Sequence, residues 1–363
     1  MEKLHINLEK NSYEIYIEEG TVSQLSNYIG RPQETVLITD ENVEKLYGKS
    51  LNALLKGRKI HRIVLPPGES TKTLGMAEKI LVDMLEYGLT RNSLVIALGG
   101  GVVGDIAGFC ASIYMRGIPY IQVPTTLLAQ VDSSVGGKTG VNMPGGKNTV
   151  GSFYQPLSVV IDTGVLKTLP KRELINGIGE VIKYGIIYDD DFLTYIDENF
   201  DDILGLEEKV IKKVIKRCCD IKASIVAKDE KEQGIRKILN FGHTIGHALE
   251  TLGNYEKYTH GEAVLIGMYY EALMAKKIGL IDDFYFQKIT KVIKKTDVSL
   301  NMKKFTIKDL VYAMEKDKKN KEDKISFIFP VGGGKAEEKL LSREDFHILY
   351  QIIGGGDKNE HSQ

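Results

Sequence analysis

The sequence predicts an N-terminal α/β domain with a mostly parallel, doubly wound sheet, followed by a mainly α-helical domain. Two observations lead to this prediction. Up to about residue 162, short apolar runs alternate with segments whose apolar residues keep helical spacing, as in parallel strands joined by crossover helices. After Leu169-Pro170 most of the chain has helical periodicity. We therefore expect a first domain over residues 1–168, a second over 169–353 and a disordered tail over 354–363.

The strands expected in the first domain share short length, apolar character and flanking turn residues. Residues 4–8 and 13–17 alternate apolar and polar side chains, which predicts a β-hairpin. A short helix is expected at 21–29, and a longer one that begins at Ser70 or Thr71 as its cap. The remaining strands are expected at 35–39, 60–65, 93–98, 118–123 and 158–162.

The second domain is expected to hold one strand, at residues 325–329, among helices. The helix over 207–229 has the strongest pattern, because its apolar residues fall on one face. The other helices are expected at 171–185, 234–252, 261–278, 283–295, 307–316 and 343–353.

Composition limits the partners of this protein. A formal net charge of −1 over 363 residues provides no overall field that would attract nucleic acid or a membrane surface. Three cysteines, two of them adjacent, do not form a disulfide framework and suit a reducing cytoplasm. We find no signal peptide and no apolar run near the roughly 20 residues of a membrane span. A small-molecule ligand in a cytoplasmic protein is therefore expected.

A glycine-rich turn follows the strand at 93–98. Gly99, Gly101 and Gly104 satisfy G-x-G-x-x-G, so backbone N–H groups at the start of the next helix could approach a phosphate. The acidic residue usually found about 20 residues downstream is missing, and Asp40 would have to replace it. Two alternatives stay open: the glycines bind phosphate or only allow close packing, and Asp40 holds a ribose or caps its own helix. Asp105 likewise could contact a cofactor or cap a helix.

Histidines and one glutamate suggest a metal site. His243 and His247 are four residues apart on a predicted helix, His260 opens the next helix, and Glu180 lies earlier. Two imidazoles and one carboxylate with an open position are typical of catalytic zinc. Which three of the four would bind is left open, and a helical histidine pair is more often structural. Glycines beside these residues predict a close approach of helices at a shared point.

Lysines and one arginine are expected near these candidate metal ligands. Lys183 follows Glu180 by three residues, and Arg236 precedes His243 by seven, which would place each on the helical face of a candidate ligand. Any single lysine is ordinarily a solvent-exposed surface residue without a binding role. Lys318 lies in a run of charged residues that is typical of a solvated loop. Together they favour an anionic substrate held over a metal; the cations are Lys138, Lys147, Lys183, Lys222 and Arg236.

These residues occur in motifs that closely resemble the 3-dehydroquinate synthase family of the sugar-phosphate cyclases. The resemblance covers nearly the whole chain, and the set of motifs is specific to this family. They are GGGVVGDIAGF, YMRGI, VPTTLLAQVDSSVGGKTGVN, GGKN, GEVIKYG, LNFGHTIGH and HGEAV.

The resemblance implies the family's fold, with a Rossmann-like N-terminal sheet, and a lyase of the shikimate pathway that uses NAD and a divalent metal, zinc or cobalt. It implies conversion of 3-deoxy-D-arabino-heptulosonate 7-phosphate to 3-dehydroquinate and phosphate. The steps are transient oxidation at C5 by NAD, phosphate elimination, re-reduction, ring opening and aldol closure. A homodimer is also implied.

The resemblance further implies roles for single residues. The metal ligands would be Glu180, His243 and His260, with His247 in the substrate site as a base or proton relay. Arg116 matches an arginine that reaches the neighbouring subunit's site. Positions that match substrate or active-site contacts are Asp132, Lys138, Asn148, Lys183, Lys222, Arg236, Asn240 and Lys318. Positions that match NAD contacts are Asp40, Glu69, Lys72, Gly100, Gly101, Asp105, Thr125, Thr126, Lys138, Lys147, Thr168, Leu169 and Glu173.

Three other interpretations compete with this one. A metal-dependent polyol dehydrogenase would share the architecture but needs fewer cations. A sister cyclase that makes 2-deoxy-scyllo-inosose or a valiolone would differ where the substrate carboxylate binds, and Lys222 and Arg236 favour dehydroquinate there. A nucleotide-binding regulatory module would not explain why the chain has the candidate metal ligands Glu180, His243 and His260.

Overall fold

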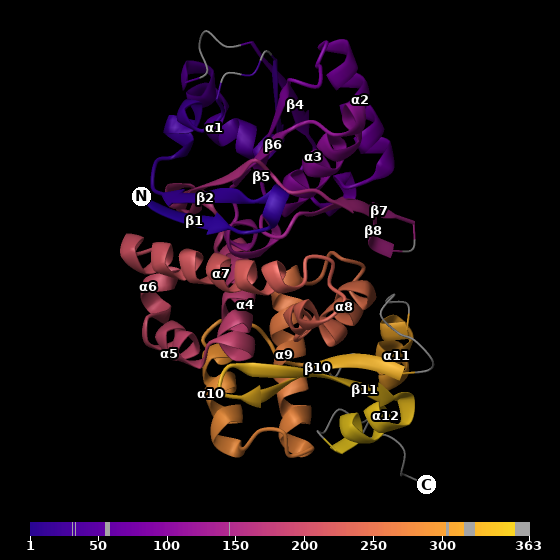
Figure 1. Cartoon of the computed structure of the whole chain (residues 1–363). Helices are drawn as coiled ribbons and strands as arrows, with labels where there is room; N and C mark the ends of the chain where they lie inside the picture. Colours follow the sequence, from indigo (N-terminus) through magenta and orange to yellow (C-terminus); the bar gives the residue numbers. More distant parts are fainter. Residues whose placement is uncertain are drawn as a thin grey trace. The chain divides into compact units, whose positions relative to one another are not determined.

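The computed structural model describes residues 1–30, 32, 34–54, 59–144, 146–302, 305–315 and 324–352 (Figure 1). The chain forms two compact units. The first consists of Met1–Leu174 and Leu206–Lys231, and the second of Ile175–Gly205 and Glu232–Gln363. The expected disordered tail over 354–363 lies outside the described residues.

The first unit is built on a seven-stranded sheet in the order β1-β2-β9-β6-β5-β3-β4. Every neighbouring pair is parallel except the N-terminal hairpin of β1 and β2, so the predicted mostly parallel sheet is confirmed. The strands are β1 (Glu2–Ile6), β2 (Tyr13–Glu18), β3 (Thr35–Asp40), β4 (Ile60–Leu65), β5 (Leu94–Gly99), β6 (Tyr120–Pro124) and β9 (Ser158–Asp162).

Alternating side chains give the sheet two buried faces. Val36 and Ile38 of β3 point into a core with α2 (Leu74–Glu86) and α3 (Gly101–Ile113). Leu37, between them, points into the opposite core with the 3₁₀ helix η2 (Val22–Asn27) and α1 (Glu41–Leu54). Because successive side chains of a strand point to opposite faces, an almost continuous apolar strand is needed when helices cover both.

The strand order reverses between β3 and β5. From β3 the chain passes through α1 to β4 at one edge, and from β5 it passes through α3 to β6 in the other direction. Ligands of open α/β sheets bind outside the carboxyl ends of the strands at such a switch point. Asp40 ends β3 and Gly99 ends β5, so both residues lie at this position.

A second hairpin, β7 (Lys138–Met143) with β8 (Gly146–Phe153), was not predicted. Its glycines gave no strand signal, because glycine is depleted in strands. The structure shows why they are present: a Cβ on Gly151 would lie 2.1 Å from the carbonyl oxygen of Thr139. The two backbones approach too closely there for any side chain.

The helix α7 (Glu208–Lys228) forms where the sequence predicted it but belongs to the first unit. Its lysines pair with the N-terminal hairpin: Lys212 Nζ lies 2.6 Å from Glu18 and Lys216 Nζ 2.5 Å from Glu2. The sequence-based division after residue 168 placed this helix in the second domain. The difference arises because these partners are about 200 residues apart in the chain.

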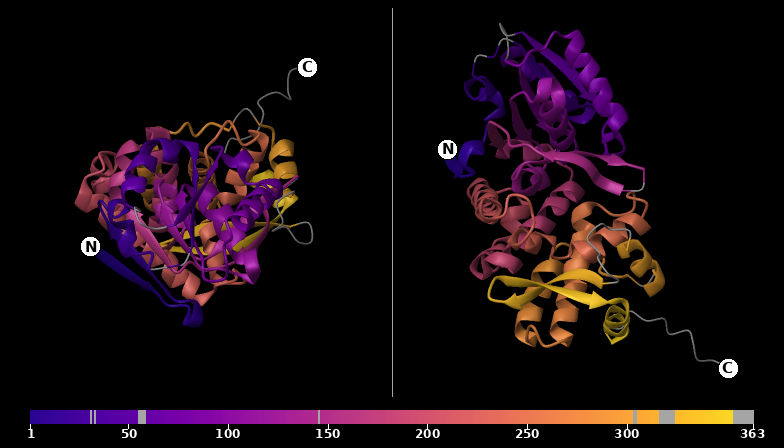
Figure 2. Two further views of the ribbon diagram at one scale, coloured as in Figure 1. Left: turned by 90° about the horizontal axis from the view of Figure 1, so that it is seen from above. Right: turned by 45° about the vertical axis from the view of Figure 1, so that its right-hand side comes forward.

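The second unit is mainly helical, as predicted. It contains a hairpin of β10 (Lys324–Gly332) and β11 (Lys335–Ser342), which packs on α9 (His260–Lys277) and α12 (Arg343–Ile352) (Figure 2). No helix in the described part of the chain is long and apolar enough to cross a membrane. The helices are α4 (Lys171–Tyr188, which spans the division), α5 (Asp190–Glu198), α6 (Phe200–Leu204), α8 (His243–Leu252), α9 (His260–Lys277), α10 (Asp283–Lys294), α11 (Ile307–Glu315) and α12 (Arg343–Ile352).

The prediction of a single helix over 234–252 is wrong. A 3₁₀ helix, η7 (Ile235–Asn240), ends before Gly242, whose φ of +78° is left-handed, and α8 begins at His243. Glycine adopts this conformation without the steric cost other residues incur. Arg236 and His243 are therefore not on one continuous helical face.

Three smaller expectations also differ from the structure. Helix α2 is capped by Thr73, whose side chain accepts the Met76 N–H, and not by Ser70 or Thr71. The segment 21–29 forms only the 3₁₀ turn η2. Strand β10 (Lys324–Gly332) continues past Pro330 and pairs with an unpredicted strand, β11 (Lys335–Ser342). Pro330 is tolerated because the register shifts directly after it.

Candidate active site

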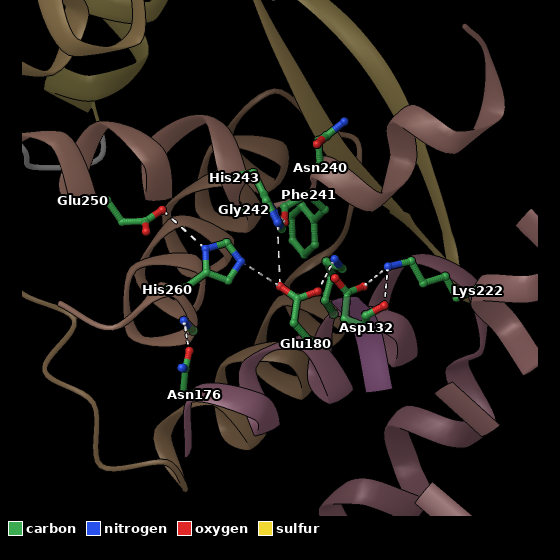
Figure 3. Close-up of polar contacts among 12 residues, drawn as sticks. Asp132, Asn176, Glu180, Lys222, Asn240, Phe241, Gly242, His243, Glu250 and His260 are labelled. Carbon is green, nitrogen blue, oxygen red and sulfur yellow. Dashed lines mark hydrogen bonds and ion pairs between the residues drawn. The ribbon is translucent and has the colours of Figure 1, made fainter. Parts of the chain in front are cut away.

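Glu180, His243 and His260 converge within the second unit (Figure 3). Glu180 comes from α4, His243 is the first residue of α8, and His260 is the first residue of α9. Glu180 Oε1 lies 3.7 Å from His243 Nε2 and 3.4 Å from His260 Nε2. One ligand atom from each residue lies within 4.8 Å of the others, which is the spacing that one bound cation requires.

Backbone-to-backbone contacts bring these three ligands together. A Cβ on Gly261 would lie 2.0 Å from the carbonyl oxygen of Asn176, and a Cβ on Gly179 2.9 Å from that of Gly261. The Asn176 side chain also accepts the Gly261 N–H at 2.6 Å, which holds the first turn of α9 against α4. The predicted close approach of helices at glycines is confirmed, because only glycine leaves room for it.

A similar contact positions α8. A Cβ on Gly267 of α9 would lie 1.9 Å from the carbonyl oxygen of Gly242. The buried carboxylate of Glu271 accepts the Gly242 N–H at 2.7 Å and lies 3.4 Å from the Ile245 N–H. A carboxylate suits this place, because the N-terminus of a helix carries partial positive charge. His243 therefore begins its helix at a position determined by α9.

The surroundings of Glu180 fit a divalent cation. Its side chain is fully buried, and its carboxylate faces an ion-pair partner, Lys183, and Nε2 of the two imidazoles. A buried carboxylate is costly unless positive charge compensates it, and Lys183 together with a bound cation would supply that charge. One carboxylate and two imidazole nitrogens suit zinc, cobalt and similar ions and leave a coordination position open.

The two histidines differ in protonation. Removal from water, together with the nearby charges of Lys183 and the other histidines, holds the pKa of His243 well below its usual value. Desolvation also acts against a charged His260, but hydrogen bonds and charges from Glu180 and Glu250 outweigh it and raise its pKa to about 10. Without a metal, His243 is therefore neutral, while His260 holds a proton between two carboxylates.

His247 lies beside this set, one turn after His243. Its ring centroid is 5.3 Å from that of His243 and 6.1 Å from that of His260. His247, Glu250 and His260 also offer three ligand atoms within 4.8 Å of one another. The four candidates thus cluster as expected, and two arrangements of three ligands are geometrically open.

The other candidates of the second unit lie on α4 and η7. Lys183 is buried and pairs with Glu180, and Arg236 is 1% exposed. Asn240 Nδ2 donates to Glu232 Oε1 at 2.8 Å. The helical-face argument for Arg236 was wrong, and the structure instead places this residue in a buried position on η7. Lys318 lies outside the described residues.

In the first unit, Asp132 and Lys222 form a pair. Lys222 Nζ donates to the Asp132 carboxylate at 2.9 Å and to its backbone carbonyl at 2.7 Å (Figure 3). Asp132 lies in a π-helical turn, η5 (Ala129–Ser133). Such turns release backbone carbonyls from the helical ladder and are frequent at functional sites. Lys138, at the start of β7, is exposed.

Lys72 links predicted NAD contacts to a predicted substrate contact. Its ammonium group pairs with Asp105 and donates to Asn148 Oδ1 at 2.5 Å. The Asn148 N–H donates to Asn142, whose side-chain amide donates to Glu69 at 2.8 Å. Burial lowers the pKa of Lys72, but the charges of Asp105 and Glu69 outweigh it and raise the pKa. Asn142 was not singled out from the sequence.

The predicted NAD contacts gather mainly at carboxyl ends of the sheet strands. Asp40 Oδ1 accepts the N–H groups of Asn42 and Val43 at 2.9 and 3.1 Å, so it caps α1. A Cβ on Gly104 would lie 2.9 Å from the side-chain oxygen of Gln122, so helix α3 packs closely against β6 at that glycine. Gly100 and Gly101 begin α3, Thr125 and Thr126 follow β6, Lys147 is in β8, and Thr168, Leu169 and Glu173 lie around the start of α4.

Arg116 is exposed and has an unusual backbone. Its φ is +67°, that of Met115 is +50°, and that of Gly117 is +112°. Three consecutive residues with positive φ are rare, and strained backbone is concentrated at functional sites. This geometry is compatible with the predicted role of Arg116.

Sequence reasoning missed the polar residues that support the ligands. Asn176, Glu250 and Glu271 are all buried. Their signal in the sequence was a polar residue at an apolar position of a helical pattern, which is costly unless the group has a partner.

Comparison with known proteins agrees with the resemblance. Residues 62–176 match the family "3-dehydroquinate synthase N-terminal" and residues 177–320 match "3-dehydroquinate synthase C-terminal". A protein of Alkaliphilus metalliredigens named 3-dehydroquinate synthase is 62% identical over 97% of this chain and 99% of its own.

Two solved structures share the fold. A 2-deoxy-scyllo-inosose synthase complexed with carbaglucose-6-phosphate, NAD+ and Co2+ is 27% identical, with a TM-score of 0.86 over 98% of this chain and 100% of that one. A 2-epi-5-epi-valiolone synthase from Streptomyces hygroscopicus subsp. jinggangensis 5008, with NAD+ and Zn2+ bound, is 25% identical, with a TM-score of 0.87 over 96% and 98%.

Proposed function

The chain belongs to the 3-dehydroquinate synthase family, and we propose that it converts 3-deoxy-D-arabino-heptulosonate 7-phosphate into 3-dehydroquinate and phosphate. The observation that carries this proposal is the 62% identity with a 3-dehydroquinate synthase over 97% of the chain. The reaction would make the protein a phosphate-eliminating lyase that depends on NAD and a divalent metal.

We assign the metal to Glu180, His243 and His260. Support comes from the buried Glu180 carboxylate, which faces Nε2 of both histidines. The structural neighbours that bind Co2+ or Zn2+ together with NAD+ support the same ion class. NAD is assigned to the switch point of the sheet, where Asp40 and the N-terminus of α3 at Gly100 and Gly101 lie.

When bound, NAD would take up and return a hydride, and the divalent ion would lower the pKa of the substrate hydroxyls that it orients. His247 is assigned as the acceptor or relay of a hydroxyl proton, because its imidazole lies beside those of His243 and His260. Arg236 is assigned to the substrate carboxylate, for which a planar guanidinium forms two parallel hydrogen bonds.

The remaining cations would act on the phosphate. During elimination the bond from carbon to the phosphate oxygen breaks, the phosphate takes up the proton of the neighbouring carbon, and a carbon–carbon double bond forms. Lysine ammonium groups stabilise the charge that develops on the leaving group. Candidates are Lys138, Lys183, Lys222 and Lys318, with Asp132, Asn148 and Asn240 as hydrogen-bonding partners. In a homodimer, Arg116 would act in the partner subunit's site.

A phosphate-release assay with the heptulosonate phosphate and NAD tests this function. We expect free phosphate without accumulation of NADH, and loss of phosphate release after chelation and dialysis. Accumulation of one NADH per substrate would instead indicate a polyol dehydrogenase. Phosphate release that persists without metal would overturn the assignment of the ligand set.

A further inference from the structure

The ring of His260 lies between two carboxylates that come from different helices. Its Nε2 lies 3.4 Å from Glu180 Oε1 of α4, and its Nδ1 lies 3.3 Å from Glu250 Oε2 of α8 (Figure 3). Glu250 is only 4% exposed. None of the roles assigned above includes this buried carboxylate.

We propose that Glu250 is a positioning residue of the metal site: it accepts a hydrogen bond from Nδ1 of His260 and so directs the Nε2 lone pair toward the ion. The proposal rests on the proposed function, because it assumes a cation at Glu180, His243 and His260. Glu250 would not contact substrate, NAD or the reacting atoms.

The chemistry of imidazole supports this role. In neutral imidazole one nitrogen carries hydrogen and the other offers a lone pair, and the partner of one nitrogen decides the state of the other. Both ring nitrogens of His260 face a carboxylate, but only Nε2 lies where Glu180 and His243 also offer ligand atoms. A cation bound there would take the place of hydrogen on Nε2, while Nδ1–H would stay on Glu250, because an ionised carboxylate only accepts hydrogen bonds. Nε2 is then the nitrogen that can bind a metal.

His243 has the same arrangement with a different acceptor. Its Nδ1 lies 3.0 Å from the backbone carbonyl of Phe241, which is also only an acceptor, and its Nε2 faces Glu180. Both histidines therefore hold Nδ1 against an acceptor and present Nε2 to the same carboxylate. Outer partners of this kind orient metal-binding histidines and increase their basicity.

The alternative is that Glu250 itself binds the ion, together with His247 and His260. Two features favour the positioning role. His260 cannot give Nδ1 to a metal while Nδ1–H donates to Glu250. Nε2 of both His243 and His260 faces the buried Glu180 carboxylate, whereas Glu250 contacts His260 through Nδ1, the other ring nitrogen.

Metal titration of the metal-free full-length protein tests the proposal. Cobalt(II) is the probe, because its visible spectrum reports the ligand set as well as occupancy. Glu250→Gln keeps the shape and one acceptor oxygen but removes the charge, and we expect it to weaken cobalt binding by about 10- to 100-fold. The wild-type spectral shape and a stoichiometry of one ion per chain should persist.

Two controls accompany this variant. Glu256→Gln makes the same change at an exposed glutamate of the same unit and should leave cobalt affinity unchanged. Glu180→Ala removes an assigned ligand and should change the spectrum as well as the affinity. If circular dichroism shows that Glu250→Gln does not fold, Glu250→Asp replaces it. Aspartate keeps the charge, but its shorter side chain moves the carboxylate away from His260, so cobalt binding should weaken too.

The outcomes distinguish a failure of the role proposed for Glu250 from a failure of the metal site itself. Cobalt affinity unchanged in Glu250→Gln would overturn the positioning role and leave the metal site intact. A changed spectrum in Glu250→Gln but not in Glu180→Ala would make Glu250 a ligand and overturn both assignments. Absence of cobalt binding by the wild-type protein would refute the metal site of the proposed function itself.

Discussion

Replacing Gly261 with alanine should weaken both the fold and the metal site. The new Cβ would lie 2.0 Å from the carbonyl oxygen and 2.7 Å from the Cα of Asn176, where real Cβ atoms keep at least 3.0 Å. The obstacles are backbone atoms, so no rotamer change relieves the clash. Helices α4 and α9 would have to separate by about 1 Å at the residue that follows His260.

The expected cost follows from three effects. Overpacking of this kind costs about 1–3 kcal/mol. Stretching the hydrogen bond from the Gly261 N–H to Asn176 adds roughly 1 kcal/mol. The better helix propensity of alanine returns up to about 1 kcal/mol. We therefore expect a net loss of about 1–4 kcal/mol in the free energy of unfolding.

Urea unfolding of the metal-free protein measures this loss, and cobalt titration measures the effect on the ligands. The matched control is Gly75→Ala, because Gly75 is also the second residue of its helix, yet no atom lies within 4 Å of its added Cβ. That control should be neutral or slightly stabilising. A Gly261→Ala variant with wild-type stability and cobalt affinity would refute the backbone-contact reasoning.

Three further predictions concern other parts of the chain. Arg116→Ala should reduce phosphate release, and mixing it with a metal-site variant should restore part of the activity if Arg116 acts across a dimer; no recovery on mixing would place it within its own subunit. Lys72→Met should lower the free energy of unfolding in urea by about 3 kcal/mol, because Asp105 loses its buried cation; an unchanged unfolding midpoint would contradict this. Burial raises the pKa of Cys110 and Cys219 to about 12, so few thiolates exist at pH 8, and iodoacetamide should label them, by mass spectrometry, only after unfolding; rapid labelling of the native protein would show that these thiols are accessible.

Secondary structure was most predictable where one chain segment carries the whole signal. The buried strands β3, β4, β5, β6 and β9 and the amphipathic helix α7 could be located from periodicity, because a covered sheet and a half-buried helix each require a regular apolar pattern. Prediction failed where a distant segment decides the conformation. The β7–β8 hairpin is rich in glycine because its two backbones touch, and glycine alone does not indicate a strand.

The candidate site shows the same division. Residue type and spacing identified Glu180, His243, His247 and His260 as candidates, since few other roles need a carboxylate and imidazoles beside helix-packing glycines. Spacing misled for Arg236, because one left-handed glycine, Gly242, interrupts the helix that the argument required.

The sequence by itself determined the parallel sheet, the helical second unit and the identity of the candidate ligands, because these depend on local pattern and on the chemistry of residue types. Only the tertiary structure decided which nitrogen of each histidine faces Glu180, that Glu250 lies behind His260, and that α7 joins the first unit. Those features depend on contacts between residues far apart in the chain. Such contacts form only when helices pack at specific distances, which a linear pattern does not encode.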